Sequence, residues 1–195
     1  MTKASDNVFP RFLISEGGST STPAANQVTV YAKANGLLYQ KDDAGVETLL
    51  AGQGFHGARA TAGAVTSLTN NAYTSIAFST ETYDTDAYHD TSTNNSRLTI
   101  PAGLGGYYAV TALACFAASG NATQRGAKIL INATTSIAAV IYGIDAWSAS
   151  ALRFNISDIY ALAAGDYIEL QQFQDSGGAI DSTTATTLAL AFLGA

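Results

Sequence analysis

The densest group of side chains that could do chemistry contains Asp84, Asp86, His89 and Asp90. Carboxylates at alternate positions can coordinate Ca²⁺, a hard cation that takes about six to eight oxygen ligands. Aspartates in solvated loops also cap turns, because their oxygens accept hydrogen bonds from nearby backbone N–H groups. We keep both interpretations open and expect no metal; if calcium binds, its ligands are Asp84, Asp86 and Asp90.

The remaining reactive residues do not form a recognisable catalytic motif. His56 and His89 are the only two histidines, and neither lies in a nucleophile elbow, a metalloprotease helix or a phosphate-binding loop. Asp166 and Glu169 are three residues apart, so on a strand they point to opposite faces. The sequence therefore predicts no enzyme, no catalytic residues and no cofactor.

Three further residues have a structural and a functional interpretation. Cys115, the only cysteine, cannot form an internal disulfide and is expected to be a small buried hydrophobe. Tyr88 and Trp147 lie in polar stretches that could form a ligand-binding loop, suitable for sugars. Trp147 could instead pack over the end of the fold, since large aromatic side chains are mostly buried.

Composition and charge exclude several classes of protein. Apolar residues make up 47% of the 195 residues and charged residues only 12%, which is unlike a disordered chain or a long-helix protein. The net charge is −6, and there is no basic stripe to neutralise phosphates, so nucleic acid is not an expected partner. Because no run of about eighteen apolar residues occurs, a membrane is not expected either.

The chain divides by pattern into three parts. Residues 1–22 form an extended arm, with a short apolar run followed by a Gly/Ser/Thr connector. Residues 23–57 form a small module and hinge: apolar and polar residues alternate at 28–32, Asn35-Gly36 predicts a tight turn, and return strands follow in a three-strand meander.

Residues 58–195 form the main domain, in which short alternating runs recur between turn signals. This pattern predicts an all-β, antiparallel sandwich. We expect its strands near residues 58–66, 73–79, 96–100, 106–117, 125–132, 136–142, 150–158, 166–174 and 185–194.

An ordered set of motifs in this domain resembles the jelly-roll superfamily of tumour necrosis factor and the globular head of the first complement component. The motifs are Ser75-Ile76-Ala77-Phe78, Tyr83-Asp84, Tyr88-His89-Asp90, Arg97-Leu98-Thr99-Ile100-Pro101, Gly105-Gly106-Tyr107-Tyr108, Gly165-Asp166-Tyr167 and Phe192-Leu193. The resemblance implies a homotrimer around a three-fold axis. The candidates for core or axis positions are Tyr108, Val110, Tyr167 and Phe192.

The preceding segment, residues 23–49, is similar to a module near the start of many tailed-bacteriophage virion proteins. Its run Tyr31-Ala32-Lys33, Gly36-Leu37-Leu38-Tyr39, Asp42 and Gly45 carries the likeness. In those proteins the module precedes fibre, spike or capsid-surface domains and is thought to attach them. Together the two resemblances imply a phage structural protein.

We therefore expect a homotrimeric capsid decoration or cement protein, or a short head fibre, on the virion's capsid surface. Its partners would be copies of itself and the major capsid protein or another virion protein. The arm residues Phe9, Phe12, Leu13 and Ile14 would anchor in the shell by burying apolar area. The alternative is the receptor-binding tip of a tail or head fibre that recognises a host glycan or surface protein.

Overall fold

The structure is a computed structural model that describes residues 21–33, 37–51, 54–119, 124–143 and 151–194. Within these ranges every regular element is a β-strand. In the described part of the chain, no helix has the length and apolar character needed to cross a bilayer. The chain separates into two compact units, Met1–Gly54 and Phe55–Ala195.

The first unit contains the predicted three-strand meander. Its antiparallel strands pair in the order β1, β2, β3, with bounds Thr29–Ala32, Leu38–Lys41 and Glu47–Ala51. Asp42 closes the second turn, because its Oδ1 accepts hydrogen bonds from the backbone N–H groups of Ala44 and Val46 at 3.0 and 2.8 Å. Asn35-Gly36, the predicted first turn, lies outside the described residues.

Hydrogen bonds and an ion pair between side chains stabilise this small sheet, which buries few apolar residues. Lys33 Nζ donates to Glu47 Oε2 at 2.5 Å, and the hydroxyl of Tyr31 donates to Glu47 Oε1. The hydrogen bond from Lys33 lowers the pKa of Glu47 below its ordinary value. The Lys33 ammonium also lies 4.1 Å from the centre of the Tyr39 ring, a cation–π contact.

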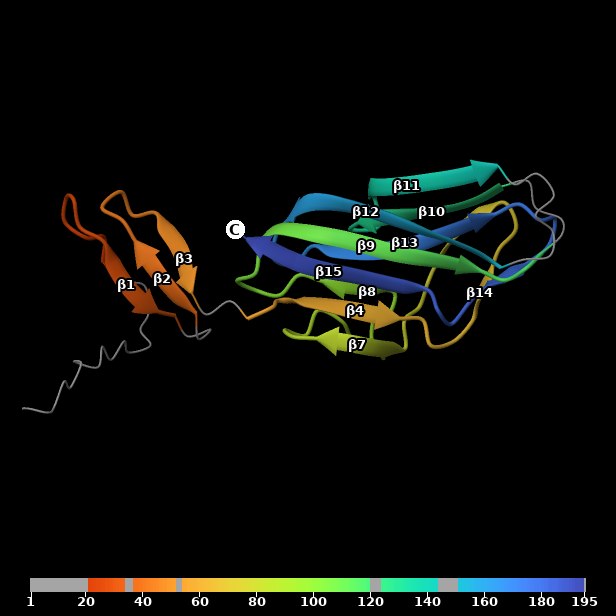
Figure 1. The fold of residues 1–195 in the computed structure, drawn as a ribbon, viewed down its shortest axis with the longest axis horizontal. Coiled ribbons are helices and arrows are strands. Elements are labelled where there is room, and N and C mark those ends of the chain that lie inside the picture. The colour runs from red at the N-terminus through yellow and green to blue at the C-terminus, as the bar shows by residue number, and fades with distance from the viewer. Residues whose placement is uncertain (1–20, 34–36, 52–53, 120–123, 144–150, 195) are drawn as a thin grey trace, which may run out of the picture. The chain divides into compact units, whose positions relative to one another are not determined.

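The second unit is a sandwich of two antiparallel sheets (Figure 1). The larger sheet has the order β12, β9, β15, β4, β7, and β14 pairs antiparallel with the last residue of β9 and with β5. The bounds of these strands are Leu152–Leu162 (β12), Gly106–Phe116 (β9), Thr187–Gly194 (β15), Gly57–Thr61 (β4), Thr80–Asp84 (β7), Ile180–Ser182 (β14) and Thr66–Leu68 (β5).

The smaller sheet has the order β11, β10, β13, β6, and β8 pairs with the other part of β13. The bounds are Thr135–Gly143 (β11), Gln124–Ile131 (β10), Tyr167–Gln174 (β13), Ala72–Ser75 (β6) and Arg97–Thr99 (β8). β8 is short, and it carries part of the candidate site.

The core lies between the two sheets and follows the period of two expected for strands. On β9 the alternate residues from Tyr108 to Phe116 face inward, and Leu188 and Leu190 of β15 join them. Ile129 of β10, and Ile168 and Leu170 of β13, close the core from the smaller sheet and are fully buried. The all-β, antiparallel sandwich predicted from the sequence is therefore the observed fold.

Three short strands, β5, β7 and β14, lie wholly or largely outside the strands expected from the sequence. β7 and β14 fall largely in segments rich in Thr, Ser and Asp, and among the described strands β7 pairs only with β4. Because β7 is an edge strand with exposed side chains, it has no buried apolar alternation to reveal it. The predicted strand 58–66 also ends early: β4 stops at Thr61, and Gly63 adopts a φ of +66°.

Candidate functional site

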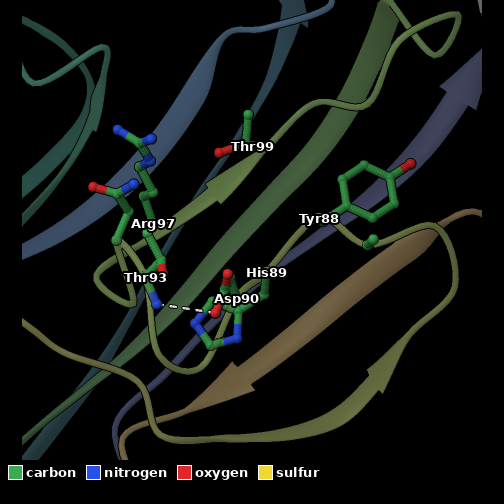
Figure 2. A pocket seen from close by; sticks show the side chains of 8 residues that line it. Tyr88, His89, Asp90, Thr93, Arg97 and Thr99 are labelled. Atoms are coloured by element: carbon green, nitrogen blue, oxygen red, sulfur yellow. Dashed lines mark hydrogen bonds between the residues drawn. The ribbon is translucent and has the colours of Figure 1, made fainter.

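A polar pocket of about 340 Å³ lies where the connection from β7 to β8 folds back beside β8. Figure 2 shows Asp90 and Thr93 joined across a turn of this connection, with Arg97 and Thr99 on the neighbouring strand. The lining residues are Ala87, Tyr88, His89, Asp90, Thr93, Asn94, Arg97 and Thr99.

Asp84, at the end of β7, holds the start of the connection. Its Oδ2 accepts a hydrogen bond from the backbone N–H of His89 at 2.9 Å. Its Oδ1 accepts from the N–H groups of Tyr88 at 2.9 Å and Asp86 at 3.3 Å. These bonds turn the chain so that the ring of Tyr88 enters the core.

The His89 side chain links the β7–β8 connection to β7 and to the residues just before β8. The side chain is buried, and its Nδ1 lies 2.9 Å from Glu81 Oε1 on β7. Its Nε2 lies 3.1 Å from the backbone carbonyl oxygen of Asn95, and Phe78 packs edge-on against the ring. Because both ring nitrogens have an acceptor and the ring is enclosed, His89 acts as an internal brace that fixes the shape of the pocket.

Asp90 organises the tip of the connection with only one of its oxygens. Oδ1 accepts from the N–H groups of Ser92 and Thr93 at 2.8 and 2.9 Å, and from the Ser92 hydroxyl at 2.7 Å. The hydrogen bonds from Thr93 and Ser92 lower the pKa of Asp90 from 3.8 to about 2, so the carboxylate is ionised at neutral pH. Oδ2 has no hydrogen bond to any residue that the structure describes.

Arg97 and Thr99 extend from the outward side of β8, while Leu98 between them is buried. The Arg97 guanidinium stacks over the Tyr167 ring at 4.4 Å. Within the described residues, no hydrogen bond or ion pair uses the side chains of Thr93, Asn94, Arg97 or Thr99. The pocket is thus rimmed by hydrogen-bonding groups that the fold itself does not use.

No motif in the sequence marks Thr93, Asn94, Arg97 or Thr99 as a site residue. A usable signal was the alternation around Leu98, which sends residues 97 and 99 to the same side of a strand. Asn94 adopts a φ of +54°, a conformation that asparagine tolerates better than most residues. Neither pattern predicts that the β7–β8 connection folds back beside β8.

The three aspartates considered as calcium ligands take separate partners. Asp84 and Asp90 cap backbone turns, whereas Asp86 Oδ2 lies 2.8 Å from His56 Nδ1 and accepts from the Thr85 hydroxyl at 2.6 Å. Among the described residues no group of three or more His, Cys, Asp or Glu side chains is placed to share a metal ion. Asp84 and Asp90 therefore have the turn-capping role that was the second interpretation of this cluster.

Of the two ligand-loop candidates, the structure describes only Tyr88. The side chain of Tyr88 is not available to a ligand, contrary to that candidate role. Its ring is 1% exposed and packs edge-on against Tyr108 in the core. Trp147 lies outside the described residues, as do the arm residues Phe9, Phe12, Leu13 and Ile14.

Of the core or axis candidates, Tyr108 and Val110 are core residues of the single chain. Phe192 is half-buried and packs on Tyr108 with ring centres 5.2 Å apart. Tyr167 is half-buried beneath Arg97 on the smaller sheet. Tyr108 and Val110 face the interior of their own sandwich, so their side chains are not available to a neighbouring copy.

The remaining chemical candidates serve the fold. Asp166 accepts hydrogen bonds from Asn132 Nδ2 and the Ala163 N–H, both at 2.8 Å, and Glu169 accepts from the Ser96 hydroxyl at 3.1 Å. Cys115 is buried as expected, and burial raises the pKa of its thiol.

No protein-family model matches the sequence, and no curated protein is significantly similar to it in sequence. Similarity appears in the structure. Two crystal structures of murine APRIL, at pH 8.5 and pH 8.0, each align with a TM-score of 0.53 at 10% identity. Each alignment covers 72% of this chain and 100% of that chain. The likeness shows the fold, a jelly roll like that of tumour necrosis factor.

Proposed function

We propose that this chain is a non-enzymatic phage structural protein, a homotrimer that decorates or cements the capsid surface or forms a short head fibre. The observation that supports it most is an apolar patch on the jelly roll, made of Tyr107 and Ile159 on the paired strands β9 and β12. These side chains are 57% and 63% exposed on strands whose opposite face is the core. Clustered exposed apolar side chains mark interaction surfaces.

The backbone around this apolar patch allows close approach by another copy. Ala109 of β9 lies opposite Ile159 of β12 and Ala191 of β15, so small residues separate the large ones. The same face is hollowed between Arg59, Tyr83 and Asn155. Large side chains next to a shallow hollow suit packing against an identical domain, the arrangement implied by the resemblance to tumour-necrosis-factor-like trimers.

The separate first unit supports the attachment part of the proposal. Residues 23–49, which are similar to the phage virion module, fall within a unit that is distinct from the jelly roll. Val28, Val30 and Val46 are exposed on this unit and can contact a larger surface. The arm side chains Phe9, Phe12, Leu13 and Ile14 would add anchoring area, and three arms per trimer would multiply their effect by effective concentration.

Removal of residues 1–22 tests this attachment. The truncated chain should remain a folded trimer by light scattering and circular dichroism, yet fail to sediment with capsids that lack the protein. The full-length chain added to the same capsids is the control. Capsid binding by the truncated trimer would show that the arm is not the anchor.

The second candidate function is the receptor-binding tip of a tail or head fibre. The pocket beside β8 favours it, because four of its polar side chains, those of Thr93, Asn94, Arg97 and Thr99, make no hydrogen bond or ion pair with the described residues. Hundreds of copies per virion would support decoration, whereas a few to dozens would support a fibre. Binding of the isolated trimer to host cells would favour the receptor-binding role.

A further inference from the structure

We propose that the pocket between the β7–β8 connection and β8 binds a neutral sugar residue. The observation that carries this inference is the meeting of one ionised carboxylate, one guanidinium, two hydroxyls and one amide around a single hollow. The inference deepens the second proposed function and rests on it for its biological role, although not for the binding itself.

The chemistry of the rim matches hydroxyl groups. Asp90 Oδ2 can only accept hydrogen bonds, and the Arg97 guanidinium can only donate them. The amide of Asn94 and the hydroxyls of Thr93 and Thr99 do both. A sugar hydroxyl also donates and accepts, so a ring bearing several hydroxyls can satisfy acceptors and donors around the same pocket.

The charges argue against an ionic ligand. A hard cation such as Ca²⁺ needs about six to eight oxygen ligands, and here the only carboxylate shares the pocket with a guanidinium. An anion would be attracted by Arg97 but repelled by Asp90, which is ionised above a pH of about 2. Because the opposite charges of Asp90 and Arg97 balance, a neutral polar ligand is favoured.

The pocket is also held in shape before any ligand arrives. Asp84 and His89 fix the connection through backbone hydrogen bonds and the contact with Glu81. The stack on Tyr167 restricts the Arg97 side chain. Groups that are already ordered lose less conformational entropy on binding, so weak individual hydrogen bonds can add up to measurable affinity. The volume of about 340 Å³ is at the small end of ligand pockets, which range from about 300 to 1,000 Å³.

Saturation-transfer NMR on the full-length protein tests the proposal. The probes are methyl glycosides of neutral hexoses, N-acetylglucosamine, sialic acid and free amino acids. We expect transfer to at least one neutral sugar and none to sialic acid or the amino acids. Transfer only to sialic acid would identify an anion site, and transfer only to amino acids would identify a zwitterion site; either result, or no transfer at all, overturns the proposal.

Two substitutions locate the binding. Arg97→Met keeps an apolar stem on the Tyr167 ring, and Thr99→Val keeps the shape of the side chain without its hydroxyl. Each should weaken the affinity for the bound sugar at least tenfold, while Arg153→Met, at an exposed arginine on β12 of the larger sheet, should not change it. Unchanged affinity in both pocket variants of a folded protein would place the sugar elsewhere and refute the assignment.

A parallel assay of binding to host cells separates the two claims. If Arg97→Met abolishes both sugar and cell binding, the sugar site serves the receptor-binding role. If the wild-type protein binds the sugar but not cells, the sugar site stands and the receptor-binding function fails.

Discussion

The hydroxyl oxygens of Tyr88 and Tyr108 lie 3.3 Å apart in the core of the jelly roll, with the two rings at 80° to each other. Tyr108 in turn donates to the backbone carbonyl of Leu104 at 2.5 Å. Burial raises the pKa of both phenols, so both remain neutral donors at physiological pH. This chain of hydrogen bonds fastens the β7–β8 connection to the central strand.

The order of the two tyrosines in that chain predicts unequal effects of removing their hydroxyls. Tyr108→Phe leaves the Leu104 carbonyl and the Tyr88 hydroxyl unpaired, at a cost of about 1–3 kcal/mol in the free energy of unfolding. Tyr88→Phe removes one hydrogen bond and leaves the bond from Tyr108 to Leu104, at a cost of about 0.5–1.5 kcal/mol. Urea unfolding at a fixed protein concentration measures both, and a larger loss in Tyr88→Phe would contradict the assigned donor order.

Asp90 predicts a stability change in acid. Its pKa in the folded protein, about 2, is below its ordinary value of 3.8, so the carboxylate stabilises the folded state above pH 4. That contribution is lost as the pH falls from about 4 to about 2. The melting temperature of wild type minus that of Asp90→Asn should therefore shrink across this range. A difference that stays constant with pH would show that the Asp90 charge is not stabilising.

Cys115 should resist thiol reagents in the folded protein. The side chain is fully buried, and the raised pKa of the thiol reduces the amount of reactive thiolate at any given pH. Labelling with Ellman's reagent at pH 8 should be at least a hundredfold slower than labelling in urea. Rapid labelling without denaturant would mean that the end of β9 opens readily.

The apolar patch gives a test of the homotrimer. Ile159→Asp or Tyr107→Asp places a charge where we propose that a second copy packs, and an unpaired charge in an apolar contact is costly. Sedimentation should show a folded single chain for each variant and three chains for the wild type. Ile141→Asp is the matched control, because Ile141 is 52% exposed on β11 of the smaller sheet. A wild-type protein that is a stable folded monomer would overturn the proposed assembly.

The architecture could be predicted because the central strands carry an apolar residue at every second position. Along β9 the alternate residues from Tyr108 to Phe116 are all apolar, and the structure buries all of them, together with Cys115. β7 and β14 could not be found this way. β7 pairs along one edge and β14 pairs over only a few residues, so neither strand shows a long alternation of buried apolar residues in its sequence.

The candidate site was only partly visible in the sequence. The sequence indicates the polar stretch at 84–90 as a possible ligand loop that includes Tyr88, but the ring of Tyr88 lies in the core. The Asp84 carboxylate, by accepting from the Tyr88 N–H, helps set the turn that sends the ring inward. The roles of Arg97 and Thr99 depend on a contact between a loop and a strand, which spacing along the chain does not encode.

The main anchoring groups of the pocket differ from the lining side chains that the fold does not use. Glu81, Asp84 and His89 fasten the connection, whereas Thr93 takes part through its backbone and Arg97 and Thr99 project from a paired strand. Replacing the side chains at 93, 97 and 99 would therefore alter the proposed sugar recognition without removing those anchoring bonds. A library randomised at these three positions would sample new specificities on an unchanged scaffold, and natural variants of such a protein could diverge in the same way.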